Sequence, residues 1–131
     1  MKKGLRGGNI LLADTSVIVE ILRGREKGKA IAQGCATEEI AISAHTAYEL
    51  LWSRPEEESK VLDMIDHMKV FNYYLKHAIK SAEMKRSLRK RGVALAEIDI
   101  FIASVALEEG LTLVTCDKGF EKIHGLQVKV F

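Results

Sequence analysis

The stretch ILLADTSVIVEIL, residues 10–22, decides how the rest of the chain is interpreted. It begins with a short apolar run, residues 10–13, which has the length and composition of a strand buried on both faces of a parallel sheet. Asp14 ends the run, and Thr15 and Ser16 follow as candidate N-caps of a helix with apolar residues at helical spacing. The stretch therefore predicts a strand, a carboxylate at its C-terminal end and a helix that leaves from that end.

Asp14 allows two interpretations at this point. Aspartate is a common N-cap, so the residue can be explained as the start of the helix and nothing more. It can equally be a functional carboxylate, because ligands bind at the carboxyl ends of strands in open α/β sheets. The positions of the other acidic residues decide between the two.

Length and composition indicate one soluble globular domain over residues 1–131, because 47% of the residues are hydrophobic and 29% charged. Segment 1–8 is basic and glycine-rich, and the four apolar residues after it are too few for a signal peptide or a membrane span. A cytoplasmic protein without a membrane partner is expected. Cys35 and Cys116 fit no zinc or redox spacing and are predicted to be free thiols. The net charge of +2 does not by itself indicate a nucleic-acid binder.

Strands and helices alternate along the rest of the chain. Further strands are predicted at 39–42, 69–71, 111–115 and 126–130, and helices at 25–34, 44–53, 55–67, 74–91 and 97–109. Ser43 is the expected cap of the helix over 44–53. This alternation favours a mostly parallel sheet with helices on both faces.

The predicted helix over 74–91 carries two faces of interest. Its apolar stripe is predicted to contain Leu75, Ala78, Ile79 and Ala82. Four cationic residues fall together on another side at 100° per residue: Lys76, Lys80, Lys90 and Arg91. This side is either an ordinary solvated face or a face that follows the phosphates of RNA.

Carboxylates occur close to several predicted strand ends. Asp14 and Asp117 follow strands directly, Glu49 lies on the helix after the second strand, and Asp99 begins a helix that leads into a strand. A parallel sheet brings such positions to one edge, where the charges repel one another unless a cation neutralises them. The oxygen ligands favour Mg²⁺ or Mn²⁺. The four histidines are scattered, and each is interpreted as structural or surface.

The segments around these acids resemble the PIN-domain family and, within it, the VapC-type toxins. They are LLADTSVIVEIL around Asp14, SAHTAYELL around Glu49, AEIDIFIASVALEEGL around Asp99, and TLVTCDKGFEKIHGLQV around Asp117. They span the chain nearly from end to end, and their order and spacing are more specific than any one of them. The resemblance implies an α/β fold, a three-layer α/β/α sandwich with a five-stranded, mostly parallel sheet.

The resemblance also implies a metal-dependent endoribonuclease. Its acidic quartet would be Asp14, Glu49, Asp99 and Asp117, of which Asp14, Asp99 and Asp117 would bind Mg²⁺ or Mn²⁺. Metal-activated water would attack the RNA phosphodiester, and no side-chain nucleophile is needed. The implied partners are the RNA substrate, a small antitoxin protein that blocks the site, and a second copy of the chain in a homodimer.

Three further residues flank the quartet. Thr15 and Thr115 match positions where the family often places a hydroxyl beside the acids. Glu97 is either an extra ligand or a charge that favours the N-terminus of its helix. Many relatives have Asn where this chain has Asp117, with a second Asp before the following Phe; here Gly119 occupies that place.

Other classes of protein fit the sequence less well. A phosphoryl-accepting receiver domain needs acids before the first strand ends and a Lys on a late strand, and neither is present. A haloacid-dehalogenase-type phosphatase needs a second Asp at the position of Ser16. A degenerate PIN domain that binds RNA or a protein without cutting it is the remaining alternative, and metal binding at the carboxylates would distinguish it from the nuclease.

Overall fold

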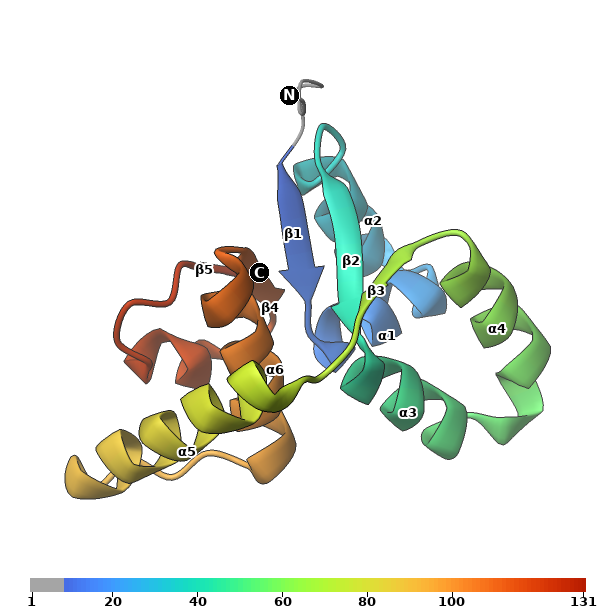
Figure 1. The fold of residues 1–131 in the computed structure, drawn as a ribbon. Helices are drawn as coiled ribbons and strands as arrows, with labels where there is room; N and C mark the ends of the chain where they lie inside the picture. The colour runs from blue at the N-terminus through green and yellow to red at the C-terminus, as the bar shows by residue number, and fades with distance from the viewer. Residues whose placement is uncertain (1–8) are drawn as a thin grey trace, which may run out of the picture.

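The computed structural model describes residues 9–131, and β1 (Ile10–Ala13) lies in the middle of its sheet (Figure 1). Segment 1–8, for which neither a signal peptide nor a span was predicted, lies outside the described residues. Among the helices of residues 9–131, none has both the length and the apolar character needed to cross a membrane.

The sheet is organised by the two neighbours of β1. In residues 9–131 it has five strands, in the order β3 (Lys69–Phe71), β2 (Glu39–Ser43), β1, β4 (Thr112–Thr115), β5 (Val128–Val130). Each pairing is parallel, and Leu12 is in register with Ala41 and Leu113. The chain moves outward from β1 to β3 and then returns to the other side of β1. The point where the strand order reverses, between β1 and β4, is where open α/β sheets bind ligands.

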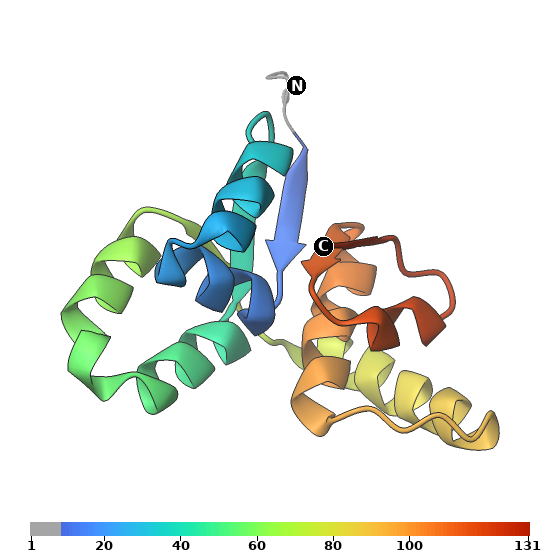
Figure 2. The same ribbon diagram turned by 180° about the vertical axis from the view of Figure 1, so that it is seen from behind.

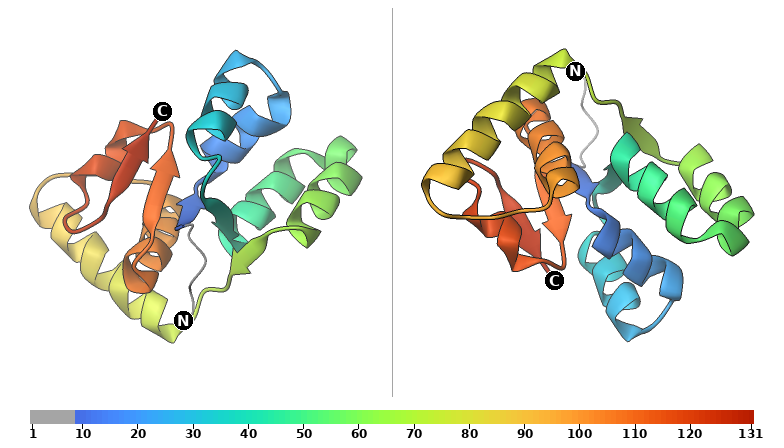
Figure 3. Two further views of the ribbon diagram at one scale, coloured as in Figure 1. Left: turned by 90° about the horizontal axis from the view of Figure 1, so that it is seen from above. Right: turned by 90° about the horizontal axis from the view of Figure 1, so that it is seen from below.

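Helices cover both faces of the sheet. One face carries α1 (Thr15–Arg23), α2 (Glu26–Gly34), α3 (Ala44–Ser53) and α4 (Glu58–Asp66). The other carries α5 (Leu75–Lys90) and α6 (Glu97–Glu109). Figure 2 shows α1 and α2 in front of the central strands, and the two views of Figure 3 separate the two groups of helices. The predicted three-layer α/β/α sandwich on a five-stranded parallel sheet is confirmed.

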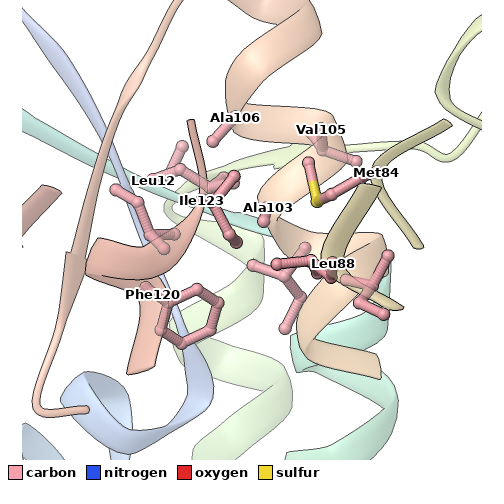
Figure 4. Close-up of a cluster of buried hydrophobic side chains, with 12 residues drawn as sticks. Leu12, Met84, Leu88, Ala103, Val105, Ala106, Phe120 and Ile123 are labelled. Carbon is pink, nitrogen blue, oxygen red and sulfur yellow. The ribbon is translucent and has the colours of Figure 1, made fainter. Parts of the chain in front are cut away.

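Side chains of β1 alternate between the two layers of core. Leu11 and Ala13 pack toward α1–α4, whereas Leu12 packs toward α5 and α6. Figure 4 shows Leu12 among side chains of α5, α6 and the 3₁₀ turn Lys118–Lys122, including Leu88 and Phe120. A strand that is apolar at successive positions is therefore explained by burial on both faces.

Gly24 adopts a left-handed conformation (φ 68°), which ends α1 before the helix that was predicted over 25–34. Two elements start later than predicted by more than one residue: β5 begins at Val128 rather than at residue 126, and α4 begins at Glu58 rather than at residue 55. Pro55 opens a short 3₁₀ turn, Pro55–Glu57, rather than the first turn of α4. Cys35 and Cys116 are free, as predicted.

The face that α5 buries differs from the predicted one. The predicted apolar stripe is wrong, because Leu75 is 76% and Ile79 is 54% exposed. The buried positions, spaced by three or four residues, are His77, Ser81, Met84 and Leu88.

Contacts with α6 explain why α5 buries polar residues. His77 Nε2 lies 2.8 Å from Glu109 Oε2, and Ser81 Oγ donates to Ser104 Oγ at 2.8 Å. Polar groups with hydrogen-bond partners can be buried, so helix packing does not have to follow hydropathy here. Two apolar side chains of α5 are left in solvent as a consequence.

Candidate active site

Asp14 is placed by the end of β1 and the start of α1. Its backbone is extended (φ −79°, ψ 175°), and Oδ1 accepts hydrogen bonds from the Val17 backbone N–H (3.3 Å) and from Ser16 Oγ (2.6 Å). Asp14 is therefore the N-cap of α1, as one of its two interpretations predicts, and the alternative of Thr15 or Ser16 as the cap is wrong. The helix begins at Thr15, so Asp14, the extended residue between the end of β1 and the helix, takes the cap position.

Thr115 joins Asp14 to the end of β4. Its hydroxyl donates to Asp14 Oδ2 at 2.7 Å and accepts the backbone N–H of Asp117 at 2.9 Å. Ser16 makes a second link, because its Oγ also accepts the Cys116 N–H at 3.1 Å. Asp14 is only 5% exposed, and these donors satisfy its buried oxygens.

Asp117 lies one residue beyond Cys116, in a more open position. Its side chain is exposed, and Oδ1 accepts the Gly119 N–H at 2.8 Å. A Cβ at position 119 would come 3.1 Å from Asp117 Oδ1 and 3.3 Å from Leu95. Glycine at position 119 therefore lets the chain turn closely around the Asp117 carboxylate.

Glu49 approaches from α3. Ser43 at the end of β2 caps this helix as predicted, because its Oγ accepts the Thr46 N–H. Glu49 is half-buried, and its Oε1 accepts a hydrogen bond from Thr15 Oγ1. Thr15 thus contacts Glu49, while Thr115 contacts Asp14.

Asp99 completes the set from the first turn of α6. Its pKa is raised from 3.8 to about 6, chiefly by burial and further by the charges of Asp14, Asp117 and Glu49. The structure therefore brings the four predicted acids into one electrostatic environment. In Figure 1, the arrowheads of β1 and β2 point toward this edge, where α3 starts.

The acids fit a hard divalent cation in donor type and charge. They offer carboxylate oxygens, and a cation would relieve the repulsion that raises the pKa of Asp99. Within residues 9–131, no three His, Cys, Asp or Glu side chains already converge as a ligand set. The carboxylates would have to draw together on binding.

Glu97 and the predicted basic face lie outside this set of acids. Lys85 Nζ on α5 donates to Glu97 Oε1 at 3.0 Å, so the Glu97 carboxylate already has a cationic partner. At the other end of the antiparallel α5–α6 pair, Lys76 contacts Glu109 at 2.9 Å. Lys76 is thus placed beside the end of α6 that is remote from Asp99.

The rest of the predicted basic face spreads along α5. Lys80 contacts Glu83 of the same helix at 3.4 Å. Among the described residues, no ion pair involves Lys90 or Arg91 at the C-terminal end of α5.

Sequence reasoning missed three residues beside the acids. Ser16 was considered only as a cap, although its hydroxyl links Asp14 to β4. Tyr48 and Trp52 flank Glu49 on α3 and were not singled out. The position of Trp52, three residues after Glu49 and four after Tyr48, was the available signal, because residues three and four apart share a helix face.

Comparisons with known proteins give one consistent family. A family model described as the PIN domain matches residues 11–126. Ribonuclease VapC2 of Haemophilus influenzae is 26% identical over 125 residues, which cover 90% of this chain and 95% of that protein.

Two solved structures share the fold. The structure of VapBC2 from Rickettsia felis, bound to a DNA fragment from its promoter, matches with a TM-score of 0.81 and 24% identity. The match covers 93% of this chain and 98% of the Rickettsia felis chain. DNA-bound VapBC from Salmonella typhimurium matches with a TM-score of 0.79 and 24% identity, covering 95% and 98%.

The raised pKa of Asp99 has a consequence for stability. Because the folded state binds the Asp99 proton more tightly than the unfolded chain does, the free energy of unfolding should fall as pH rises from 3.8 to about 6. Asp99→Asn should flatten this part of the profile and raise the melting temperature at pH 7. Thermal unfolding in EDTA across this range measures both effects.

Asp66→Asn, at an exposed position of α4, is the matched control for that experiment. It should leave the slope of the profile unchanged. If Asp99→Asn retained the wild-type slope, the carboxyl of Asp99 would not be perturbed by its surroundings.

Proposed function

The chain belongs to the PIN-domain family, and from this premise we propose that it is a VapC-type toxin, an endoribonuclease that hydrolyses RNA with a bound divalent cation. The observation that carries the proposal is that Asp14 and Asp117 lie at the same end of the paired strands β1 and β4, both hydrogen-bonded to Thr115. The charges of Asp14, Asp117 and Glu49 also raise the pKa of Asp99, which agrees with this placement. The name of its relative, Ribonuclease VapC2, supports RNA as the substrate. RNA and antitoxin would meet this protein in the cytoplasm.

Three of the four acids are the proposed ligands of the cation. Asp14, Asp99 and Asp117 hold the cation, which is Mg²⁺ or Mn²⁺ because the donors are carboxylate oxygens. When bound, this ion supplies Lewis-acid activation of water and stabilises the leaving oxygen. Thr115 and Ser16 fix the orientation of Asp14 by donating to its two oxygens.

Glu49 is the fourth acid of the proposed site. Thr15 donates to Glu49 Oε1 and so positions this carboxylate at the edge of the site. Glu49 is half-buried in α3, the helix that follows β2. Glu97 contributes charge at the start of α6, where its partner is Lys85.

The proposal includes a small antitoxin protein and a homodimer. The VapBC structures from Rickettsia felis and Salmonella typhimurium support an antitoxin partner. Exposed apolar side chains at Leu75 and Ile79, one turn apart on α5, support a protein contact on that helix.

Asp14→Asn tests the nuclease directly. Asparagine is also a good N-cap and keeps the Oδ1 acceptor, so α1 and the fold should survive. Cleavage of RNA in Mg²⁺ or Mn²⁺ should drop by orders of magnitude, because the ligand charge is lost. Asp117→Asn should be milder, since Asp117 is exposed. Cleavage rate and melting temperature are measured for each variant.

EDTA provides the control for the same assay and should stop cleavage by the wild-type protein. Undiminished cleavage in EDTA would contradict the metal mechanism. If Asp14→Asn lost its fold together with its activity, Asp14 would be only a structural cap.

The basic side of α5 is proposed to bind RNA phosphates. Replacing Lys76, Lys80, Lys90 and Arg91 by Gln should weaken RNA binding and flatten its dependence on salt, by about 0.7 in the log–log slope for each phosphate that the protein no longer neutralises. Affinity measured at several salt concentrations gives this slope. The control carries the same reduction of charge elsewhere, at Lys27, Lys29, Lys60 and Lys69.

An equal change of slope in the two variants would show that only net charge matters. An unchanged slope in the α5 variant would show that this side of the helix is an ordinary solvated face.

A further inference from the structure

Two aromatic side chains stand in solvent on α3, next to Glu49. Tyr48 is 59% and Trp52 is 70% exposed. At 100° per residue, Trp52 lies 40° from Tyr48 and 60° from Glu49 on the helix circumference, so the three share one face. Burial of large aromatic side chains is a major source of core and interface energy, so two of them left in solvent beside an acidic site call for an explanation.

A cavity of about 290 Å³ opens at this face. Its lining is Thr15, Tyr48, Glu49, Trp52 and Ser53. Two of these residues belong to the candidate active site and are joined by the hydrogen bond from Thr15 to Glu49. Thr15 and Glu49 therefore line the cavity and also belong to the candidate active site. None of the lining residues is Lys or Arg, so the cavity is not built to hold a phosphate.

We propose that this cavity holds a base of the RNA substrate, stacked on Trp52 and Tyr48, from a nucleotide that flanks the scissile phosphate. The inference rests on the proposed ribonuclease function and adds a specificity-determining surface to it. Aromatic faces stack on unpaired bases of any sequence, which is how proteins commonly hold single-stranded RNA. The scissile phosphate lies at the acids, so the base of a neighbouring nucleotide can enter the cavity next to Glu49.

The lining favours a base over an apolar protein anchor. An apolar side chain in the cavity would bury the Glu49 carboxylate without a new hydrogen-bond partner. The edge of a base carries N–H groups that can donate to such a carboxylate. Trp52 thus supplies the stacking surface, and the Glu49 carboxylate supplies the hydrogen-bond acceptors.

Stacking of this kind contributes equally before and during the reaction. Trp52→Ala should therefore raise KM and leave kcat unchanged. The expected rise is about 5-fold to about 140-fold, the range given by alanine substitution at base-stacking positions. Trp52→Phe should restore most of the affinity, because it keeps an aromatic face. Leu62→Ala removes an exposed apolar side chain of α4 and is the matched control, with KM expected to stay at the wild-type value.

RNA that lacks one base tests the stacking itself. The cleavage site in a short RNA is mapped with wild-type protein and Mg²⁺, and abasic residues are then placed on each side of it. Trp52→Ala should impair cleavage of the intact RNA, whereas wild type and Trp52→Ala should cleave one of the abasic RNAs equally well. An equal loss on every substrate, or no loss on any, would overturn the proposal.

Fluorescence gives a readout that does not need cleavage. Trp52 is the only tryptophan of the chain, so its emission reports this cavity alone. With EDTA present to keep the RNA intact, single-stranded RNA should quench the emission, and a phosphodiester chain without bases should not. Absence of RNA quenching would overturn the stacking proposal, even if the wild-type protein cleaves RNA. If RNA quenches the emission but the protein cleaves no RNA, the nuclease assignment fails while base binding stands.

Sedimentation of Trp52→Ala tests whether a second copy of the chain, rather than RNA, covers the aromatic face. Dissociation of a wild-type dimer by this substitution would mean that the aromatic face contacts a second copy, and the proposal would be overturned. An unchanged oligomeric state together with raised KM supports the base-stacking site. Loss of binding to a purified antitoxin, with RNA cleavage intact, would assign the face to that protein instead.

Discussion

The hydrogen bond from Thr115 Oγ1 to Asp14 Oδ2, 2.7 Å long, is the interaction on which the site depends. It joins residues 101 positions apart and ties the end of β4 to the end of β1. A buried carboxylate is costly unless donors surround it, and Asp14 receives donors from Ser16 and Val17 as well. The same Thr115 hydroxyl accepts the Asp117 N–H, so one side chain sets the positions of two acids.

The arrangement favours function at the expense of stability in the metal-free protein. Burial and three like charges raise the pKa of Asp99, which means that its ionised form is disfavoured in the fold. A hydrophobic or amide side chain at position 99 would avoid this penalty. Clusters of repelling groups of this kind are typical of functional sites, where local consistency with the fold is given up for chemistry.

Much of the fold and the acid positions could be predicted from local sequence. The strand before Asp14 and the cap at Ser43 follow from short-range patterns, and parallel strands bring their carboxyl ends to one edge. The face of α5 could not be predicted in this way. Its buried positions depend on hydrogen bonds from His77 and Ser81 to α6, which join residues 32 and 23 positions apart.

The same limit applies to the details of the site. The sequence offers Asp14, Thr15 and Ser16 as alternative caps of α1, and the choice among them depends on where the strand ends and the helix begins, a boundary that hydropathy places poorly. The ion pairs of Lys76 with Glu109 and of Lys85 with Glu97 cross from α5 to α6, so helical spacing alone could not reveal them. The cavity beside Glu49 needs both α1 and α3 in place.

The central claim is that acids at the end of β1, in the first turn of α6 and after the end of β4 form one cation site. Calorimetric titration of Mn²⁺ into the metal-free protein at pH 7 tests it most directly. The account predicts saturable binding by the wild-type protein, and loss of that binding in folded Asp14→Asn and Asp99→Asn. Binding that is absent from the wild-type protein, or that survives in both variants, would contradict it and would favour a PIN domain that binds without cutting.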